Sequence, residues 1–203
     1  MTIQMSVAEA AKVVGGTAVG ASQFVGCDVD SRRVPPRGLF VALPGERVDG
    51  HDFVATALSS GAGAAMVQRT MSDADGSLVI VDDCRLALGR LAGHWRERFD
   101  IPVLGITGSN GKTTVKNMLA AIVGRRAAVM STPGNFNNEI GLPLTLMTLG
   151  EEHRYAVVEL GANHLGEIAH LAAMAGPQVG VITQCAPAHI EGFGSIRNVA
   201  KAK

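Results

Sequence analysis

The residues most suited to chemistry stand together in residues 105–114, which have the sequence GITGSNGKTT. A glycine-rich turn followed by Lys112 and Thr113 is typical of a phosphate-binding loop, in which backbone N–H groups and a helix N-terminus face the phosphates. The lysine supplies a positive charge there, and the threonine hydroxyl can ligate Mg²⁺. The strict pattern has glycine at the position of Ile106, so a tight turn with a solvated lysine is the alternative.

The elements predicted around this stretch favour the phosphate site. Residues 101–106 are an apolar run typical of a buried strand, and residues 113–123 carry apolar side chains at helical spacing. A strand, a turn and a helix in this order are the context that the pattern requires. The residues that we predict to bind phosphate are Gly108, Ser109, Asn110, Gly111, Lys112, Thr113 and Thr114.

A carboxylate follows a later strand. Glu159 lies near the carboxyl end of a strand predicted over residues 155–160, where an unpaired carboxylate is costly. In nucleotide sites an acidic residue at the end of a neighbouring strand commonly holds Mg²⁺. An ion pair or a helix N-cap is the alternative, and the nearby phosphate loop favours the metal.

Other polar side chains also follow predicted strands. Asn163 and His164 come soon after that carboxylate and could reach a phosphate or metal, or could simply shape the turn. His189 follows a strand predicted over residues 179–183 and is a candidate second metal ligand, although a lone histidine is more often structural. The amide-rich residues 134–141 could bind a polar substrate or cap the next helix, and the residues alone do not separate these roles.

The first half of the chain predicts short strands, among them residues 24–29 and 39–43, joined by loops that contain proline and glycine. Two of these loops carry side chains that could grip a polar ligand. The residues concerned are Ser31, Arg32, Glu46 and Arg47. An ordinary solvated surface is the alternative, and these residues alone favour that alternative.

The order of the predicted elements indicates an α/β protein in two parts. The pattern restarts as strand, loop and helix after a boundary near residues 99–101. Residues 1–99 predict a small mixed α/β domain, whereas the alternating strands and helices of residues 100–203 predict right-handed βαβ units and a parallel sheet. Ligands of such sheets bind at the carboxyl ends of the strands, where the phosphate loop and Glu159 are expected.

The composition excludes several classes of function. The 18 basic and 18 acidic residues of this 203-residue chain balance, so no nucleic-acid or anionic-membrane surface is indicated. No apolar run approaches the length of a membrane span, and the N-terminus lacks the features of a signal peptide. Three distant cysteines, Cys27, Cys84 and Cys185, suit a reducing compartment better than a disulfide framework or a zinc site. We therefore expect a cytoplasmic protein without membrane insertion.

Five separated motifs, in the same order along the chain, resemble the Mur ligase family. The first occupies residues 30–53 with short gaps and resembles the family's first domain. The second, residues 105–114, resembles the family's phosphate loop, which tolerates the missing glycine. The other three, residues 134–138, 159–164 and 188–195, resemble one branch in particular. The resemblance covers essentially the whole chain.

This resemblance implies an ATP-dependent peptide ligase of peptidoglycan precursor synthesis. In the branch concerned, ATP phosphorylates the terminal carboxylate of UDP-N-acetylmuramoyl-tripeptide, and the amine of D-Ala-D-Ala attacks the resulting acyl phosphate. The resemblance implies ATP and Mg²⁺ as cofactors, and we expect a monomer when the protein is full length.

The resemblance also implies roles for individual residues. Lys112 and the loop amides would hold ATP. Thr113, Glu159 and His189 would hold Mg²⁺. Lys203 is similar to a lysine that some Mur ligases carbamylate, which turns a cation into a metal-binding anion. The implied catalytic residues are thus Lys112, Glu159, His189 and Lys203. The residues implied to contact the UDP-sugar substrate are Ser31, Arg32, Glu46, Arg47 and Asn138.

In the family, the ATPase domain continues well past the position of Lys203, and a third domain follows it. We therefore expect a UDP-muramoyl-peptide-binding domain over residues 1–99 and a truncated P-loop ATPase domain over residues 100–203, with little or no ligase activity alone. The alternatives are a sister ligase that adds the third amino acid, a folylpolyglutamate synthetase, and a non-catalytic nucleotide or UDP-sugar-binding module. Residues 161–164 and the first-domain motifs argue against the first two.

Overall fold

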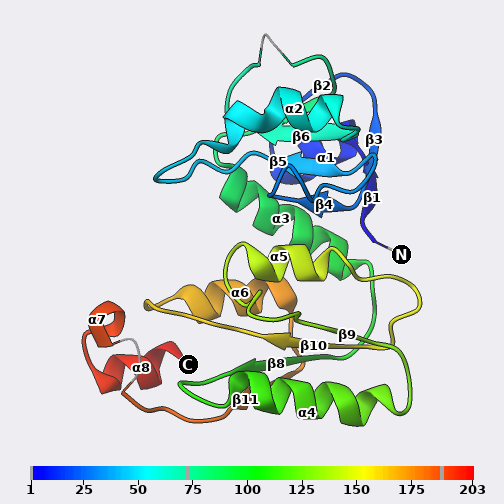
Figure 1. Ribbon diagram of the computed structural model, residues 1–203. Helices are drawn as coiled ribbons and strands as arrows, with labels where there is room; N and C mark the ends of the chain where they lie inside the picture. Colours follow the sequence, from blue (N-terminus) through cyan, green and yellow to red (C-terminus); the bar gives the residue numbers. More distant parts are fainter. Residues whose placement is uncertain (1, 72–73, 188–189) are drawn as a thin grey trace. The chain divides into compact units, whose positions relative to one another are not determined.

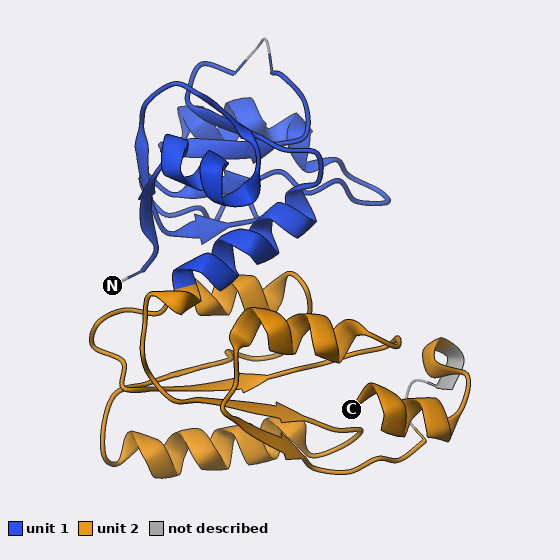
Figure 2. Ribbon diagram, turned by 180° about the vertical axis from the view of Figure 1, so that it is seen from behind, with its two compact units in different colours: residues 1–95 blue, residues 96–203 orange. Residues whose placement is uncertain are grey.

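The computed structural model describes residues 2–71, 74–187 and 190–203. Contacts divide the chain into two units, residues 1–95 and residues 96–203 (Figure 2). Both units combine helices with strands, which confirms the predicted α/β class. Which substrate each unit binds stays a prediction.

The first unit is built on a five-stranded sheet (Figure 1). In spatial order its strands are β2 (Thr17–Val19), β7 (Leu78–Ile80), β6 (Ala64–Val67), β5 (Leu39–Val41) and β4 (Cys27–Asp28). The edge strand β2 runs antiparallel to β7, and all other neighbours are parallel, so the sheet is mixed. A separate antiparallel pair joins β1 (Gln4–Ser6) to β3 (Gln23–Val25).

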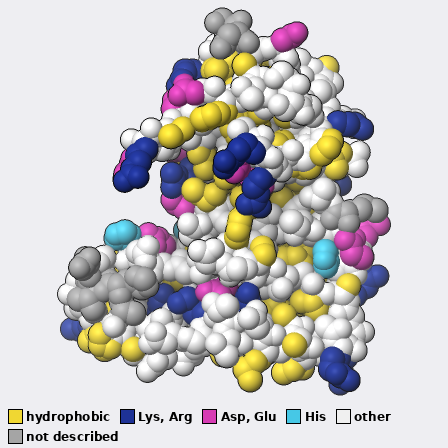
Figure 3. All heavy atoms as spheres, in the orientation of Figure 1, with side chains coloured by type: hydrophobic (Ala, Val, Ile, Leu, Met, Phe, Trp, Pro, Cys, Tyr) yellow, Lys and Arg dark blue, Asp and Glu magenta, His cyan; other side chains and the backbone are white. Residues whose placement is uncertain are grey.

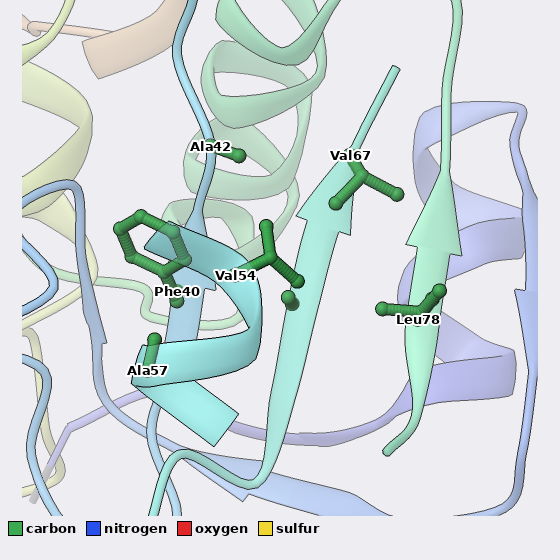
Figure 4. Close-up of a cluster of buried hydrophobic side chains, with 7 residues drawn as sticks. Phe40, Ala42, Val54, Ala57, Val67 and Leu78 are labelled. Atoms are coloured by element: carbon green, nitrogen blue, oxygen red, sulfur yellow. The ribbon is translucent and has the colours of Figure 1, made fainter. Parts of the chain in front are cut away.

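Helices cover this sheet and complete its core. They are α1 (Val7–Val14), the 3₁₀ turn η1 (Gly50–Phe53), α2 (Val54–Ser59) and α3 (Cys84–Glu97). Figure 4 shows side chains of α2 packed against those of β5, β6 and β7. The buried cluster consists of Phe40, Ala42, Val54, Ala57, Ala65, Val67 and Leu78. The parallel strands β5 and β6 are buried along their whole length, as expected for strands covered on both faces.

The prediction of one continuous strand over residues 24–29 was wrong, because the structure has two strands there. Gly26 separates β3 from β4 and has φ +80°. A Cβ at this position would lie 2.7 Å from Cγ of Pro35, so the chain turns where only glycine fits. The break allows β3 to pair with β1 while β4 pairs with β5.

The second unit has the parallel sheet that the sequence predicts. In spatial order its strands are β11 (Val179–Ile182), β8 (Val103–Thr107), β10 (Tyr155–Glu159) and β9 (Val129–Ser131). Helix α4 (Lys112–Gly124) lies on one face, and α5 (Gly141–Leu146) and α6 (Glu167–Ala175) lie on the other (Figure 1). The short helices α7 (Ile190–Phe193) and α8 (Ile196–Ala202) follow β11. Because all four strands are parallel, their carboxyl ends meet at one edge of the sheet.

Within the described residues, no helix combines the length and the apolar character needed to cross a membrane.

Candidate active site

Residues 108–111 join β8 to α4 and form the predicted phosphate loop. Gly108 has φ +140°, and a Cβ there would collide with Oγ1 of Thr183, so the loop passes the end of β11 where no side chain fits. Gly111 has φ +78°, and no side chain in the described part of the chain caps α4. The first N–H groups of α4 can therefore serve a bound anion, which the helix dipole also favours.

The ammonium of Lys112 lies over this loop. From the first turn of α4, it donates a hydrogen bond to the carbonyl oxygen of Gly108 at 2.9 Å. A lysine on a flexible stem can turn from this carbonyl to a phosphate that the same loop cradles. The geometry therefore suits the contact that the pattern predicts.

Ser109 ties the loop to the chain that follows β11. Its Oγ donates to the carbonyl oxygen of Ala186 at 2.9 Å and accepts from the N–H of the same residue at 3.0 Å. Its own N–H donates to the carbonyl oxygen of Gln184 at 2.8 Å. Oγ1 of Thr183 also donates to the carbonyl oxygen of Asn110 at 2.6 Å. These bonds fix the shape of the loop, and phosphate binding by Ser109 itself stays a prediction.

The carboxylate of Glu159 is the centre of the site's hydrogen bonding. The residue is 1% exposed. Oε2 accepts from Oγ1 of Thr113 at 2.8 Å, and Oε1 accepts from Nδ2 of Asn137 at 2.8 Å. Its backbone N–H donates to Oγ1 of Thr132 at 2.9 Å. The structure thus brings together Thr113 and Glu159, two of the three residues predicted to hold Mg²⁺.

The donor set at this point fits Mg²⁺. A hydroxyl oxygen and a carboxylate oxygen in contact are hard ligands, and Mg²⁺ commonly takes one or two protein ligands while keeping several waters. No cluster of three or more His, Cys, Asp or Glu side chains that could hold a metal occurs within the described residues. The third predicted ligand, His189, lies outside the described residues.

Sequence reasoning missed two residues that organise this network, Asn137 and Lys116. Lys116 is 3% exposed, and its ammonium donates to the carbonyl oxygen of Thr132 at 2.7 Å. Lys116 and Thr113 are three residues apart on α4 and therefore share a face of the helix. That spacing was the signal available in the sequence. Together the two side chains bind α4 to the ends of β9 and β10.

Asn138 caps a helix. Its Oδ1 accepts from the N–H groups of Ile140 and Gly141, at 3.2 and 2.8 Å, where α5 begins. Capping was one of the two roles that the sequence left open for this segment. The cap does not use Nδ2, so this group remains able to make the contact with substrate that the sequence predicts.

His164 and Glu167 shape the turn that leads into α6. Nδ1 of His164 lies 2.8 Å from Oε1 of Glu167, whose Oε2 accepts from the N–H groups of Asn163 and His164 at 2.7 and 3.2 Å. Burial acts to raise the pKa of Glu167, but these hydrogen bonds outweigh it and the pKa lies below its ordinary value. The carboxylate therefore stays ionised and holds the turn.

Lys203 follows α8, with its ammonium 5.6 Å from the centre of the Phe193 ring. Partial burial, and then the positive charge of Lys112, lower the pKa of Lys203. A lowered pKa enlarges the fraction of neutral amine, which is the form that reacts with carbon dioxide.

In the first unit, the four predicted substrate residues lie at one edge of the sheet. Ser31 and Arg32 follow β4, whereas Glu46 and Arg47 follow β5. Because β4 and β5 are parallel neighbours, both loops leave the sheet at the same edge. Figure 3 shows basic and acidic side chains on the visible face of this unit. Charged groups therefore stand where a parallel sheet receives ligands.

The guanidinium of Arg32 is held within its own turn. Nε and Nη2 donate to the two carboxylate oxygens of Asp30 at 2.9 and 2.8 Å. This hydrogen bond lowers the pKa of Asp30 to about 2. An anionic ligand at Arg32 would share the guanidinium with Asp30.

The loop of Glu46 and Arg47 is fastened at its base by His51. This histidine is 2% exposed, and its Nε2 accepts from the N–H of Gln68 at 2.8 Å. The proton of the neutral ring is therefore on Nδ1, which donates to Oδ1 of Asp49 at 2.6 Å. Hydrogen bonds from the backbone and then the ring of His51 lower the pKa of Asp49 to about 2. The loop tip is exposed, but its base is bound to the end of β6.

Both parts of the chain match one family of known proteins. Residues 106–203 match the Mur ligase middle domain, and residues 23–96 match the catalytic domain of the Mur ligase family. The UDP-N-acetylmuramoyl-tripeptide--D-alanyl-D-alanine ligase of Escherichia coli (strain K12) is 45% identical over 202 residues, which cover 99% of this chain and 44% of that protein. The ligase of the same name from Haemophilus influenzae is 43% identical over 206 residues, which cover 100% of this chain and 44% of that protein.

Solved structures agree with the sequence matches. MurF from Acinetobacter baumannii has a TM-score of 0.93 and 37% identity, with 100% of this chain and 46% of that chain covered. MurF ligase from Thermotoga maritima in complex with ADP has a TM-score of 0.80 and 36% identity, with 87% of this chain and 41% of that chain covered. The chain spans about half the length of the curated relatives that it matches. From its phosphate loop, its parallel sheet and these matches, the chain belongs to the Mur ligase family.

Proposed function

We propose that the protein acts in the ATP-dependent joining of D-Ala-D-Ala to UDP-N-acetylmuramoyl-tripeptide. The observation that carries the proposal is the bond between Thr113 and Glu159 beside the phosphate loop, at the carboxyl ends of parallel strands. It occurs in a chain that is 45% identical, over 99% of its length, to a ligase named for this reaction.

The second unit would bind the phosphates of ATP. The loop amides and Lys112 would hold the phosphates, since phosphoryl transfer depends chiefly on positioning and on neutralising the charge of the transferred group. Thr113 and Glu159 would hold Mg²⁺, which when bound neutralises negative charge on the phosphates. Their mutual hydrogen bond keeps both oxygens in place for that role.

His189 and Lys203 would serve a second Mg²⁺. The neutral amine of Lys203 would add to carbon dioxide, forming an N–C bond and releasing one proton, which leaves a carbamate with a negative charge. Partial burial favours this step because it lowers the pKa of the amine. Carbamylation would thus replace the ammonium of Lys203 with a carbamate, whose oxygens are ligands of the kind that Mg²⁺ prefers.

Residues 1–99 would bind the UDP-linked substrate through Ser31, Arg32, Glu46 and Arg47. Asn138 is proposed separately as a residue that contacts this substrate. The terminal carboxylate of the tripeptide would attack the γ-phosphorus of ATP and release ADP. The amine of D-Ala-D-Ala would then attack the acyl phosphate, and loss of phosphate would leave the new peptide bond. Because these substrates are cytoplasmic metabolites, we place the reaction in the cytoplasm. We also propose that the full-length enzyme is a monomer.

Calorimetric titration of this chain tests the proposal, with UDP-N-acetylmuramoyl-tripeptide and Mg-ADP added separately. We expect both ligands to bind. Lys112→Ala is expected to weaken Mg-ADP binding by about tenfold or more, about 1.4 kcal/mol, and to leave tripeptide binding unchanged. Lys12→Ala, at an exposed lysine of α1, is the matched control and is expected to change neither affinity.

A comparison of two UDP-linked ligands tests the substrate. A ligase that adds D-Ala-D-Ala is expected to prefer the tripeptide to UDP-N-acetylmuramoyl-dipeptide. Preference for the dipeptide would indicate the sister ligase that adds the third amino acid. Absence of nucleotide binding in the unmodified chain would overturn the phosphate site.

A further inference from the structure

Thr107 carries a buried hydroxyl that the fold does not use. It is the last residue of β8 and is 6% exposed. Its Oγ1 is the one buried side-chain polar atom without a hydrogen-bond partner in the part of the chain that the structure describes. Buried polar groups are almost always paired, so this exception, one residue before the phosphate loop, calls for an explanation, and a bound ligand is one.

The backbone holds this residue firmly in place. The carbonyl oxygen of Thr107 accepts from the N–H of Thr183 at 3.0 Å. The next residue, Gly108, begins the phosphate loop. The backbone that carries the hydroxyl is therefore held by β8 and by the end of β11.

The hydroxyl and the predicted metal ligands lie on opposite faces of the sheet. Side chains alternate along a strand, so Thr107 shares a face with Gly105, where a Cβ would lie 3.1 Å from Cβ of Pro177, after α6. Glu159 is in register with Ile106 and binds Thr113 of α4, on the other face. Thr107 therefore adds a donor on the side of the loop away from these two residues.

The surroundings of this hydroxyl suit an anion. The ammonium of Lys112 lies 2.9 Å from the carbonyl oxygen of Gly108, the residue that follows Thr107. A hydroxyl donor next to a loop that carries an ammonium group, at the carboxyl ends of parallel strands, is suited to an anionic oxygen.

We propose that Oγ1 of Thr107 donates a hydrogen bond to the terminal phosphoryl group of a bound nucleoside triphosphate. This inference rests on the proposed function. The N–H groups at the start of α4 stand at the far end of the loop and would serve the inner phosphates, whereas Thr107 stands at its beginning. The hydroxyl would therefore distinguish a triphosphate from a diphosphate.

The test compares Mg-ADP with Mg-AMP-PNP, a non-hydrolysable triphosphate, in calorimetry of the unmodified chain and of Thr107→Val. Valine keeps the shape and removes only the hydroxyl. We expect the affinity for Mg-AMP-PNP to fall by about tenfold, as for one charge-assisted hydrogen bond. We expect the affinity for Mg-ADP to stay within about twofold, and Tm not to fall, because the hydroxyl has no partner to lose. Thr107→Ser is expected to restore triphosphate binding.

Thr145→Val is the matched control. Its hydroxyl is also buried, at 2% exposure, but donates to the carbonyl oxygen of Gly141 at 2.9 Å. We expect this variant to lower Tm and to leave both nucleotide affinities unchanged.

Three outcomes would overturn the inference about Thr107. They are equal losses for both nucleotides in Thr107→Val, no loss for either, and a fall in Tm like that of Thr145→Val. If the unmodified chain binds neither nucleotide, the phosphate site itself is wrong and the inference falls with it. If the unmodified chain binds both and Thr107→Val binds both equally well, only the inference fails.

Discussion

The two candidate sites of this chain are built in different ways. In the second unit, side chains of the site bind one another: Glu159 is buried and accepts from Thr113 and Asn137. In the first unit, Glu46 and Arg47 stand exposed on a loop whose hydrogen bonds are at its base. One site is a buried network, and the other is a pair of surface loops on a rigid sheet.

This difference indicates how each site would meet its ligand. A satisfied buried network is rigid, and rigidity suits a phosphate site, where catalysis depends on position. Exposed loops with few buried contacts open at low cost and can adapt to a large substrate such as a UDP-linked peptide. We therefore expect mutations to act through local geometry in the second unit and through loop support in the first.

The largest effect is expected from Phe40→Ala, which removes the support beneath the loops of the first unit. Phe40 is 1% exposed within the core of α2 and the sheet. The loss of a buried phenyl group costs about 3–5 kcal/mol, a large part of a domain's stability. We expect urea denaturation to show this loss and calorimetry to show that tripeptide binding disappears while Mg-ADP binding remains.

Phe53→Ala provides the control for that experiment. Phe53 belongs to the same unit but is 40% exposed, so its loss is expected to cost much less than that of Phe40. If Phe40→Ala also abolished Mg-ADP binding, the two sites would not be supported separately and the comparison would fail.

A smaller effect is expected from Glu159→Gln, which tests the buried network. The amide keeps the shape of the carboxylate but removes its charge and places a donor against one of its two donor partners, Thr113 and Asn137. Hydrogen bonds to charged groups contribute about 1.5–3 kcal/mol, so Mg-ADP affinity is expected to fall about 10- to 100-fold. Repeating the titration of ADP with EDTA is expected to remove the difference from the unmodified chain. Equal losses with and without Mg²⁺ would contradict a metal role.

The geometry of the predicted phosphate loop was largely predictable because it follows from local order, whereas phosphate binding stays a prediction. A strand, glycines, Lys112, Thr113 and a helix specify the loop, and the parallel topology brings Glu159 to its side. Asn137 was missed because three asparagines stand close together, and the backbone path decides which of them reaches Glu159. The role predicted for His189 stays a prediction.

The fold class was predictable for a similar reason, and its shortest elements were not. Apolar runs typical of strands, alternating with segments of helical periodicity, were enough to predict the parallel sheet of the second unit. Strands β1 and β2 have three residues each and are partly or wholly exposed, so they lack the buried apolar run that predicted the equally short β5. The break at Gly26 depends on a positive φ, which an apolar run does not reveal.

A modest effect is expected from Asp49→Asn, which loosens the base of the loop in the first unit. The hydrogen bonds to His51 lower the pKa of Asp49 from 3.8 to about 2. Because the folded pKa is depressed, the carboxylate stabilises the protein above about pH 4, and this contribution is lost as the pH falls toward 2. Its side chain is 34% exposed, so solvent screens its ion pairs and we expect only about 0.5–1.5 kcal/mol at neutral pH.

Unfolding of both proteins across this pH range measures the effect. The difference between Asp49→Asn and the unmodified chain should shrink between pH 4 and pH 2. Asp52→Asn, at an exposed residue of η1, is the control and should show no comparable loss. A difference that did not change with pH would mean that Asp49 does not act through its charge. If Asp49→Asn also weakened tripeptide binding, Asp49 would contribute to ligand binding as well as to the stability of the loop.

The smallest effect is expected at Asn138, where the two roles left open by the sequence can be separated. Asn138→Asp keeps the oxygen that caps α5, so stability should change by less than about 0.5 kcal/mol, whereas Asn138→Ala loses the cap and should cost about 1 kcal/mol. Asn138→Asp replaces the Nδ2 donor with a second carboxylate oxygen and adds a negative charge, so Asn138→Ala, which loses the donor without adding charge, must show the same loss of affinity. If that donor contacts the UDP-linked substrate, calorimetry should show a loss of about two- to tenfold in tripeptide affinity. Unchanged affinity in Asn138→Asp would assign Asn138 to the cap alone, and the adaptable part of substrate binding would then belong to the loops of the first unit.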